Sequence, residues 1–186
     1  AALSIPEDSV LVASTGVIGK QIPIDKIAAG VEMLKPQLAA TREAAATAAQ
    51  AIMTTDTEPK EVAVQIEIGG KTVTIGSMCK GSGMIHPNMC TMLAFVTTDA
   101  NISKEMLQKC VSNDVKDTFN MISVDGDTST NDTLLVLANG DLDALPAHLH
   151  PIAPDNLCLE VYDAFFPLAQ QRQHPLSLTL PEDSVP

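Results

Sequence analysis

Two runs of alternating residues, separated by a pair of glycines, constrain the fold of this chain most strongly. Residues 61–68 read EVAVQIEI, with valine or isoleucine at every second position, as in a strand with one face buried. Gly69 and Gly70 follow, a pair that suits a tight two-residue turn. Residues 71–76, KTVTIG, then supply the returning strand. The pattern predicts an antiparallel β-hairpin whose first strand is half-buried.

Three further segments have the spacing or the capping residues of helices. Residues 23–34 begin with a proline, which suits the start of a helix, and repeat apolar residues at helical spacing. Residues 41–53 are rich in alanine, whose small side chain allows close packing against another layer. Before residues 104–119, Ser103 occupies the N-cap position, and Glu105 lies in the first turn. We therefore expect three helices.

Short apolar runs predict three buried strands, at residues 9–13, 92–97 and 134–138. With the hairpin and the helices, they indicate an α/β fold. This pattern ends near residue 140. Residues 141–186 are rich in proline, and we expect only an interrupted helix and a polar tail there. The expected organisation is a core over residues 1–140, followed by a separate segment.

The composition excludes several classes of protein. The chain has 186 residues, about one domain, and 45% of them are hydrophobic, which suffices for a core. Its net charge is −12, and its 11 lysines and arginines are scattered, which argues against nucleic-acid binding. No apolar run is long enough to predict a membrane span, and the first residues lack the pattern of a secretory signal.

The cysteines are spaced without a CxxC pair or a zinc-site pattern, so we expect no metal site. Such spacing fits free thiols in a reducing compartment, and the cytoplasm is the expected location. The four cysteines are Cys79, Cys90, Cys110 and Cys158.

The segment from Lys80 to Asp99, KGSGMIHPNMCTMLAFVTTD, says most about chemistry. It places Thr91 at the head of an apolar run, after a flexible Gly-Ser-Gly stretch. A threonine hydroxyl is a weak nucleophile, but the α-amino group of an N-terminal threonine, with a pKa of about 8, can accept its proton. A catalytic role therefore implies cleavage of the Cys90–Thr91 bond. The alternative is that Thr91 is an ordinary β-branched residue at the boundary of an element.

Four blocks carry a resemblance to a known family. They are VASTGVIG at residues 12–19, AIMTTDT at residues 51–57, KGSGMIHPNMCTMLAF at residues 80–95 and SVDGDTSTNDT at residues 123–133. In this order they resemble the ornithine acetyltransferase family, the bifunctional glutamate N-acetyltransferases of arginine biosynthesis. The resemblance extends over about residues 5–140 and fades beyond them.

The resemblance implies a layered, self-processing acyltransferase fold with sheets covered by helices, similar to the N-terminal-nucleophile architecture. Self-cleavage would give an α chain ending at Cys90 and a β chain starting at Thr91, which assemble into a further oligomer. Thr91 would bind N-acetylornithine, take its acetyl group and pass it to glutamate. No cofactor or metal is implied, although acetyl-CoA remains open as a second acetyl donor.

The resemblance also assigns roles to residues outside the cleavage segment. Thr15 and Gly16 match the oxyanion-hole pair, although Ser-Thr-Gly by itself is typical of a simple turn. Lys80 matches a substrate-binding lysine that would contact an amino-acid carboxylate; its alternative is a solvated loop lysine. Thr54 would hydrogen-bond the substrate, with the neighbouring Thr55 as its competitor.

Three features within the blocks have weaker functional interpretations. His86 would be a general base, but a histidine beside a proline is more typical of a loop, and an N-terminal threonine supplies its own base. Cys90 stands where the family usually has alanine, and it is the alternative nucleophile. Residues 125–132 resemble a calcium loop, yet Val136 occupies the twelfth position, where an EF-hand needs glutamate. A turn lining the active-site region is the preferred interpretation.

The chain also departs from the family. We find no DGEGATK segment after Gly140, where the family keeps an acidic substrate-binding residue. Two classes of function therefore remain open. One is the acetyltransferase. The other is an inactive or hydrolytic, aminopeptidase-like relative, or a partial chain of the enzyme without activity.

Overall fold

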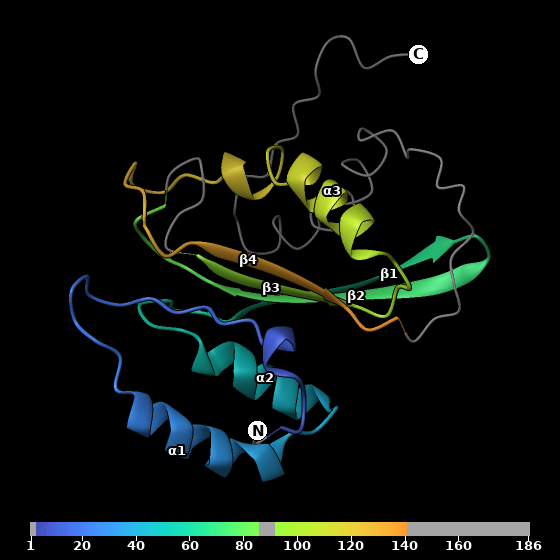
Figure 1. Cartoon of the computed structure of the whole chain (residues 1–186). Coiled ribbons are helices and arrows are strands. Elements are labelled where there is room, and N and C mark those ends of the chain that lie inside the picture. The colour runs from blue at the N-terminus through green and yellow to red at the C-terminus, as the bar shows by residue number, and fades with distance from the viewer. Residues whose placement is uncertain (1–2, 86–91, 141–186) are drawn as a thin grey trace. The chain divides into compact units, whose positions relative to one another are not determined.

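The computed structural model describes residues 3–85 and 92–140, and it is an α/β structure built on one four-stranded sheet (Figure 1). The chain divides into two units, Ala1–Leu145 and Pro146–Pro186, and the second lies outside the described residues. Within the described part, the strands follow the order of the sequence across the sheet. They are β1 (Lys60–Ile68), β2 (Lys71–Lys80), β3 (Leu93–Thr98) and β4 (Thr133–Ala138).

The predicted hairpin is confirmed. Strands β1 and β2 pair antiparallel from Ile68 opposite Lys71 to Lys60 opposite Cys79. The two-residue turn between them places Gly69 at φ 59° and Gly70 at φ 77°. Positive φ at both positions is strained for other residues, which explains the glycine pair.

Burial within the hairpin differs from the expectation. Val62 and Val64 are exposed, so the expected half-burial of the first strand is wrong in its first half. Strand β1 is an edge strand of the sheet in the described part of the molecule, and it pairs with β2 alone. Strand β2 runs four residues beyond the predicted Gly76, because it also pairs with β3.

The core of the sheet lies where β3 pairs on both sides. Strand β3 is antiparallel to β2 and parallel to β4, with Leu93 opposite both Lys80 and Thr133. The strands predicted around residues 92–97 and 134–138 are therefore confirmed, with bounds shifted by about one residue. The buried apolar residues of the described chain are Ala49, Val73, Ile85, Met92, Leu93, Ala94 and Ala100.

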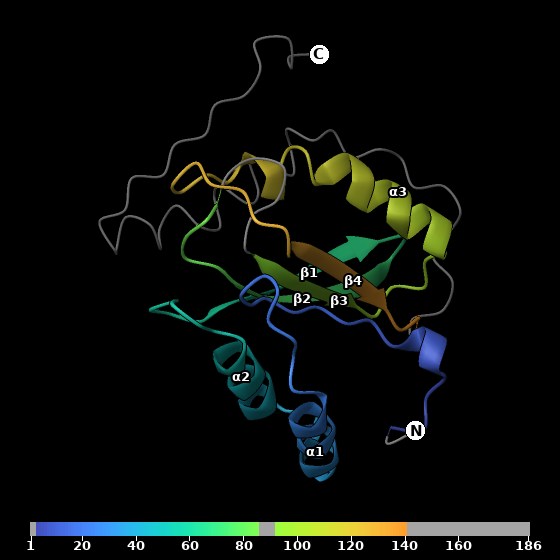
Figure 2. The same cartoon turned by 60° about the vertical axis from the view of Figure 1, so that its left-hand side comes forward.

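Two of the predicted helices lie on opposite sides of this sheet in both views (Figures 1 and 2). Helix α2 (Arg42–Ala51) contacts β1 and β2, and the Thr41 hydroxyl caps it by accepting a hydrogen bond from the amide of Ala44 at 3.2 Å. Helix α3 (Lys104–Asp114) has the predicted cap. The Ser103 hydroxyl accepts from the amide of Met106 at 3.2 Å. The predicted extension of α3 to residue 119 is wrong, because turns follow Asp114.

Helix α1 (Ile24–Leu34) forms where predicted, with Pro23 immediately before its first turn. Its apolar stripe is nevertheless exposed at each of its four positions. These are Ile24, Ile27, Val31 and Leu34.

The strand predicted at residues 9–13 is wrong. The chain there makes a short 3-10 turn at Glu7–Ser9 and then continues without regular structure. None of the described strands pairs with it, and Val12 is 82% exposed. An apolar run becomes a strand only when another strand satisfies its backbone groups, and this segment has no such partner in the described chain.

Candidate functional site

The site is built where β2 ends and both β3 and β4 begin. Lys80, the last residue of β2, pairs with Leu93, which in turn pairs with Thr133 at the start of β4. Lys80 is only 3% exposed. The alternative interpretation, a solvated loop lysine, is therefore wrong for this structure, because the register places Lys80 within the sheet.

The carboxylate of Asp132 interacts electrostatically with the positive charge of Lys80. Burial raises the pKa of Asp132, while a hydrogen bond from the Met92 amide and the positive charge of Lys80 oppose that rise. The amide of Met92 donates to Asp132 Oδ1 at 3.2 Å. Asp132 thus connects the substrate-binding lysine proposed by the resemblance with the residue that follows Thr91.

Asp56 ties a second loop to the residue after Lys80. Its side chain is 1% exposed, and its Oδ1 accepts from Lys60 Nζ at 2.6 Å and from the Gly81 amide at 2.7 Å. The Thr54 amide approaches Oδ2 at 3.4 Å. Burial alone would raise the pKa of Asp56, but the hydrogen bonds from Lys60, Gly81 and Thr54 outweigh it and lower the pKa. The carboxylate therefore stays charged and fixes the backbone beside Lys80.

The two threonine candidates of this loop differ in their contacts. The Thr55 hydroxyl lies 2.6 Å from the Ser82 hydroxyl, a hydrogen bond between the two loops. The Thr54 hydroxyl makes no hydrogen bond to another residue in the described part of the chain, and Thr54 is exposed. The Thr54 hydroxyl is thus accessible to a ligand, whereas the Thr55 hydroxyl holds its loop to Ser82.

Thr15 and Gly16 line a pocket of about 450 Å³ together with Thr130 and Asn131. The last two belong to the stretch that leads into Asp132. The Ser-Thr-Gly turn and the Asp132 region, more than 100 residues apart in sequence, therefore meet in one cavity.

Gly16 does not use the conformational freedom that glycine offers. The described glycines with positive φ include Gly19 and exclude Gly16. A Cβ built on Gly16 would meet no described atom within 4 Å, so the backbone there borders open space. A Cβ at position 16 would therefore meet no steric obstacle among the described atoms.

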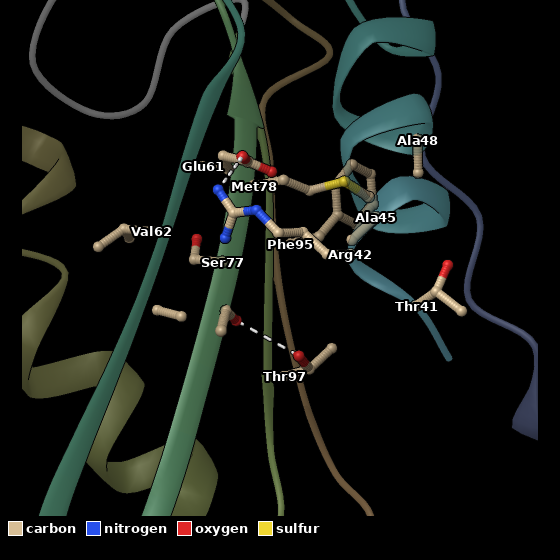
Figure 3. Close-up of a pocket in the computed structure, with 12 residues that line it drawn as sticks. Thr41, Arg42, Ala45, Ala48, Glu61, Val62, Ser77, Met78, Phe95 and Thr97 are labelled. Atoms are coloured by element: carbon tan, nitrogen blue, oxygen red, sulfur yellow. Dashed lines mark hydrogen bonds and ion pairs between the residues drawn. The ribbon is translucent and has the colours of Figure 1, made fainter. Parts of the chain in front are cut away.

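A larger cavity, of about 680 Å³, lies between α2 and the sheet, away from these residues (Figure 3). Its lining is mainly apolar, with Ala45 and Met78 facing the space. At its edge, Arg42 points toward Glu61 at 3.8 Å. Since Arg42 is largely exposed, this ion pair contributes little to stability. None of the site residues predicted from the sequence lines this cavity.

Three predicted residues, Thr91, Cys90 and His86, lie outside the described residues. The structure brings their described neighbours Ile85 and Met92 into contact with residues 123–132, the stretch that we call the acidic loop. Asp125 Oδ2 accepts from the Met84 amide at 2.5 Å, and Oδ1 accepts from the Ile85 amide at 2.8 Å. These two hydrogen bonds lower the pKa of Asp125.

Sequence reasoning missed Asp56. It expected the turn at residues 125–132 to line the active-site region, but it gave Asp125 and Asp132 no role in holding backbone amides. All three aspartates lie inside the blocks that carry the resemblance. Which backbone amides they accept from depends on contacts over 25–41 positions of sequence.

Cys79 and Cys110 are free, as expected, and burial raises the pKa of the Cys79 thiol. Within residues 3–85 and 92–140, no cluster of three or more histidine, cysteine, aspartate or glutamate side chains could hold a metal ion. None of the helices in that same part of the chain has the length and apolar character needed to cross a membrane.

Comparison with known proteins gives one consistent result. The model of the ArgJ family matches residues 1–171. Three of the most similar curated relatives are each named arginine biosynthesis bifunctional protein ArgJ. They come from Listeria monocytogenes serovar 1/2a (59% identical over 138 residues), Symbiobacterium thermophilum (57% over 139 residues) and Lactococcus lactis (55% over 133 residues).

These matches cover 72–75% of this chain and 33–34% of the relatives. The chain therefore spans about a third of the length of the curated relatives that it matches.

Proposed function

Because the chain belongs to the ArgJ family, we propose that it supplies the nucleophile and the oxyanion hole of an acetyltransferase of arginine biosynthesis. In this proposal the assembled protein moves an acetyl group from N-acetylornithine to glutamate. It adopts the layered, self-processing fold of N-terminal-nucleophile type, of which the four-stranded sheet is one part. Since the matched relatives are about three times as long as the matching segment, the activity is proposed for the assembled protein.

One observation carries the proposal. Thr15 and Gly16 share a pocket with Thr130 and Asn131, and the next residue, Asp132, binds the amide of Met92. The expected oxyanion-hole residues thus lie beside the stretch that leads into Asp132, whose carboxylate binds the residue after Thr91. This proximity supports a single site for a threonine nucleophile and the donors that would stabilise its oxyanion.

Self-cleavage comes first in the proposed sequence. The Thr91 hydroxyl attacks the carbonyl carbon of Cys90, and the C–N bond of the Cys90–Thr91 peptide breaks, which leaves an ester and a free α-amino group. Water then hydrolyses the ester to a Cys90 carboxylate and the Thr91 hydroxyl. The new α-amino group is the base that the hydroxyl lacked.

Acetyl transfer then takes two steps. Thr91 attacks the acetyl carbonyl of N-acetylornithine while its amine takes the hydroxyl proton, and ornithine leaves with that proton on its own amine. The amine of glutamate next attacks the acetyl-threonine ester, which restores the hydroxyl and releases N-acetylglutamate. One site that serves both substrates in turn predicts ping-pong kinetics.

The described side chains take distinct parts in this scheme. Lys80 is proposed to hold the carboxylate that both amino-acid substrates carry. The accessible hydroxyl of Thr54 is proposed to hydrogen-bond the substrate, because Thr55 is already engaged with Ser82. Acetyl-CoA as a further donor, the cytoplasmic location and the assembly of α and β pieces into an oligomer belong to the same proposal.

Mass analysis of the denatured protein tests the cleavage. The wild type is expected as two pieces divided between Cys90 and Thr91, and Thr91→Ala as one uncut chain without transferase activity. A Thr91→Ala protein that is still divided at this bond would show that another nucleophile acts. Ornithine release without N-acetylglutamate would instead identify a hydrolytic relative.

Steady-state kinetics of the cleaved enzyme test the division of roles. Lys80→Ala should chiefly raise KM, because its contact exists in the ground state and the transition state alike. Thr15→Ala should lower kcat by a factor on the order of 10² to 10³ if Thr15 stabilises the oxyanion. A rise in KM from both substitutions, with kcat unchanged, would assign Thr15 to substrate binding.

A further inference from the structure

The acidic loop holds the chain upstream of the proposed cleavage site at one buried residue, Ile85. The Ile85 amide donates to Asp125 Oδ1 at 2.8 Å. Its carbonyl oxygen accepts from the amides of Val124 at 2.6 Å and Asp125 at 3.3 Å, and from the Ser123 hydroxyl at 3.4 Å. Both peptide groups that flank Ile85 are therefore bonded to the same loop.

The loop holds the downstream chain in the same way at a second buried residue, Met92. The Met92 amide donates to Asp132 Oδ1 at 3.2 Å. Its carbonyl oxygen accepts from the amide of Thr133 at 3.1 Å, directly beyond the end of the acidic loop. Ile85 and Met92 are thus each held by a donor and an acceptor, and an aspartate accepts the amide in both cases.

We propose that Asp125 and Asp132 are positioning residues for self-cleavage, an inference that rests on the proposed function. Anchoring Ile85 and Met92 fixes both ends of the stretch that contains the proposed cleavage site. Fixing the two ends of a chain segment reduces the number of conformations open to it. An intramolecular attack gains most of its rate from such restriction, because the hydroxyl and the carbonyl must meet in one geometry.

The two aspartates use their oxygens differently, which makes the inference testable. Asp125 accepts the Met84 amide with one oxygen and the Ile85 amide with the other. An asparagine at this position has one acceptor oxygen, and its NH₂ group would face a backbone N–H. Asp132 accepts from a described backbone amide with Oδ1 alone, so an asparagine there can keep its bond to Met92.

The experiment follows cleavage in time. The full chain is made by cell-free synthesis, samples are quenched in denaturant, and the uncut and cut masses are measured. Asp125→Asn should slow cleavage about tenfold or more, since a bond to a charged acceptor is lost. Leucine is close to aspartate in shape but has no hydrogen-bond acceptor, so Asp132→Leu should also slow cleavage about tenfold or more. Asp132→Asn should stay within about threefold of the wild type.

Asp127→Asn is the matched control, because Asp127 is an exposed acid of the same loop. Its side chain makes no hydrogen bond to another residue of the described chain. This variant should cleave at the wild-type rate. Melting temperatures, measured in the uncleavable Thr91→Ala background, separate positioning from loss of fold. A positioning defect slows cleavage in a variant that melts close to the control.

The outcomes are distinct. Wild-type cleavage rates in both Asp125→Asn and Asp132→Leu would overturn the positioning role. If Asp125→Asn has a lowered melting temperature, the comparison of Asp132→Asn with Asp132→Leu tests the positioning role instead. Equal cleavage rates in these two variants would also overturn that role. A wild-type chain that stays whole would contradict self-cleavage itself, and this inference with it.

Discussion

Helix α1 and strand β2 differ in how far their apolar residues are buried. Val73, in β2, is 1% exposed and pairs with Ile66 of β1. Val31, in α1, is 38% exposed and belongs to an apolar stripe that is exposed along its length. A helix satisfies its backbone within itself, whereas a strand needs neighbours. Regular structure in α1 therefore says nothing about whether its apolar face is covered.

The comparison also separates two kinds of contact. Strand β2 ends at Lys80, where loops from distant parts of the sequence meet and aspartates hold the backbone. Helix α1 has no contact of that kind in the described chain, and its neighbour is the short turn Lys35–Gln37 that follows it. The same substitution should therefore have different consequences in α1 and in or beside β2, and three matched pairs test this.

The largest difference is expected for valine to alanine. Val73→Ala should lower the free energy of unfolding by about 2–3 kcal/mol, because it removes buried methyl groups and leaves a cavity. Val31→Ala should change it by less than about 0.5 kcal/mol, since the side chain is partly exposed and alanine favours the helix. Urea unfolding followed by circular dichroism measures both. Equal losses would show that α1 is buried in solution and would break the comparison.

The second difference concerns aspartate to asparagine. Asp56→Asn should lower the free energy of unfolding by about 1–2 kcal/mol, because the charged acceptor of Lys60 and Gly81 is lost while Lys60 stays partly solvated. Asp25→Asn, in the first turn of α1, should cost only about 0.5 kcal/mol, from a weaker interaction with the helix dipole.

The pH dependence sharpens this second pair. The pKa of Asp56 is lowered below its ordinary value of 3.8 in the folded state. Its stabilising effect is therefore complete above pH 3.8 and is lost as the pH falls through the folded pKa. The difference between wild type and Asp56→Asn should be constant at neutral pH and shrink in acid. A difference that grows in acid would contradict the direction of the shift.

The smallest effects are expected for glycine to alanine, and they should have opposite signs. Gly70→Ala should cost about 1 kcal/mol, because φ at this turn position is 77°. Gly30→Ala, within α1, should stabilise the protein by about 0.5–1 kcal/mol, since a Cβ there meets no described atom within 4 Å. Thermal unfolding resolves both. Destabilisation by Gly30→Ala would indicate that something covers α1.

The sequence by itself determined the elements whose causes are local. The alternation before Gly69-Gly70 specified the hairpin together with the glycine pair, because glycine accepts positive φ at both turn positions at little cost. Ser103 specified the start of α3, and Thr41 that of α2, because each hydroxyl reaches an amide three residues ahead. The four motif blocks likewise identified the family, which the comparisons confirmed.

Tertiary structure decided what depends on distant partners. The apolar run at residues 9–13 has the composition of a strand, but no described strand pairs with it. Lys80 is buried because the register places it opposite Leu93. Nothing within the acidic loop itself specifies that its aspartates accept amides about 40 residues away. Hydrogen bonds between segments far apart in the chain depend on how the strands align, and that alignment is a property of the whole sheet.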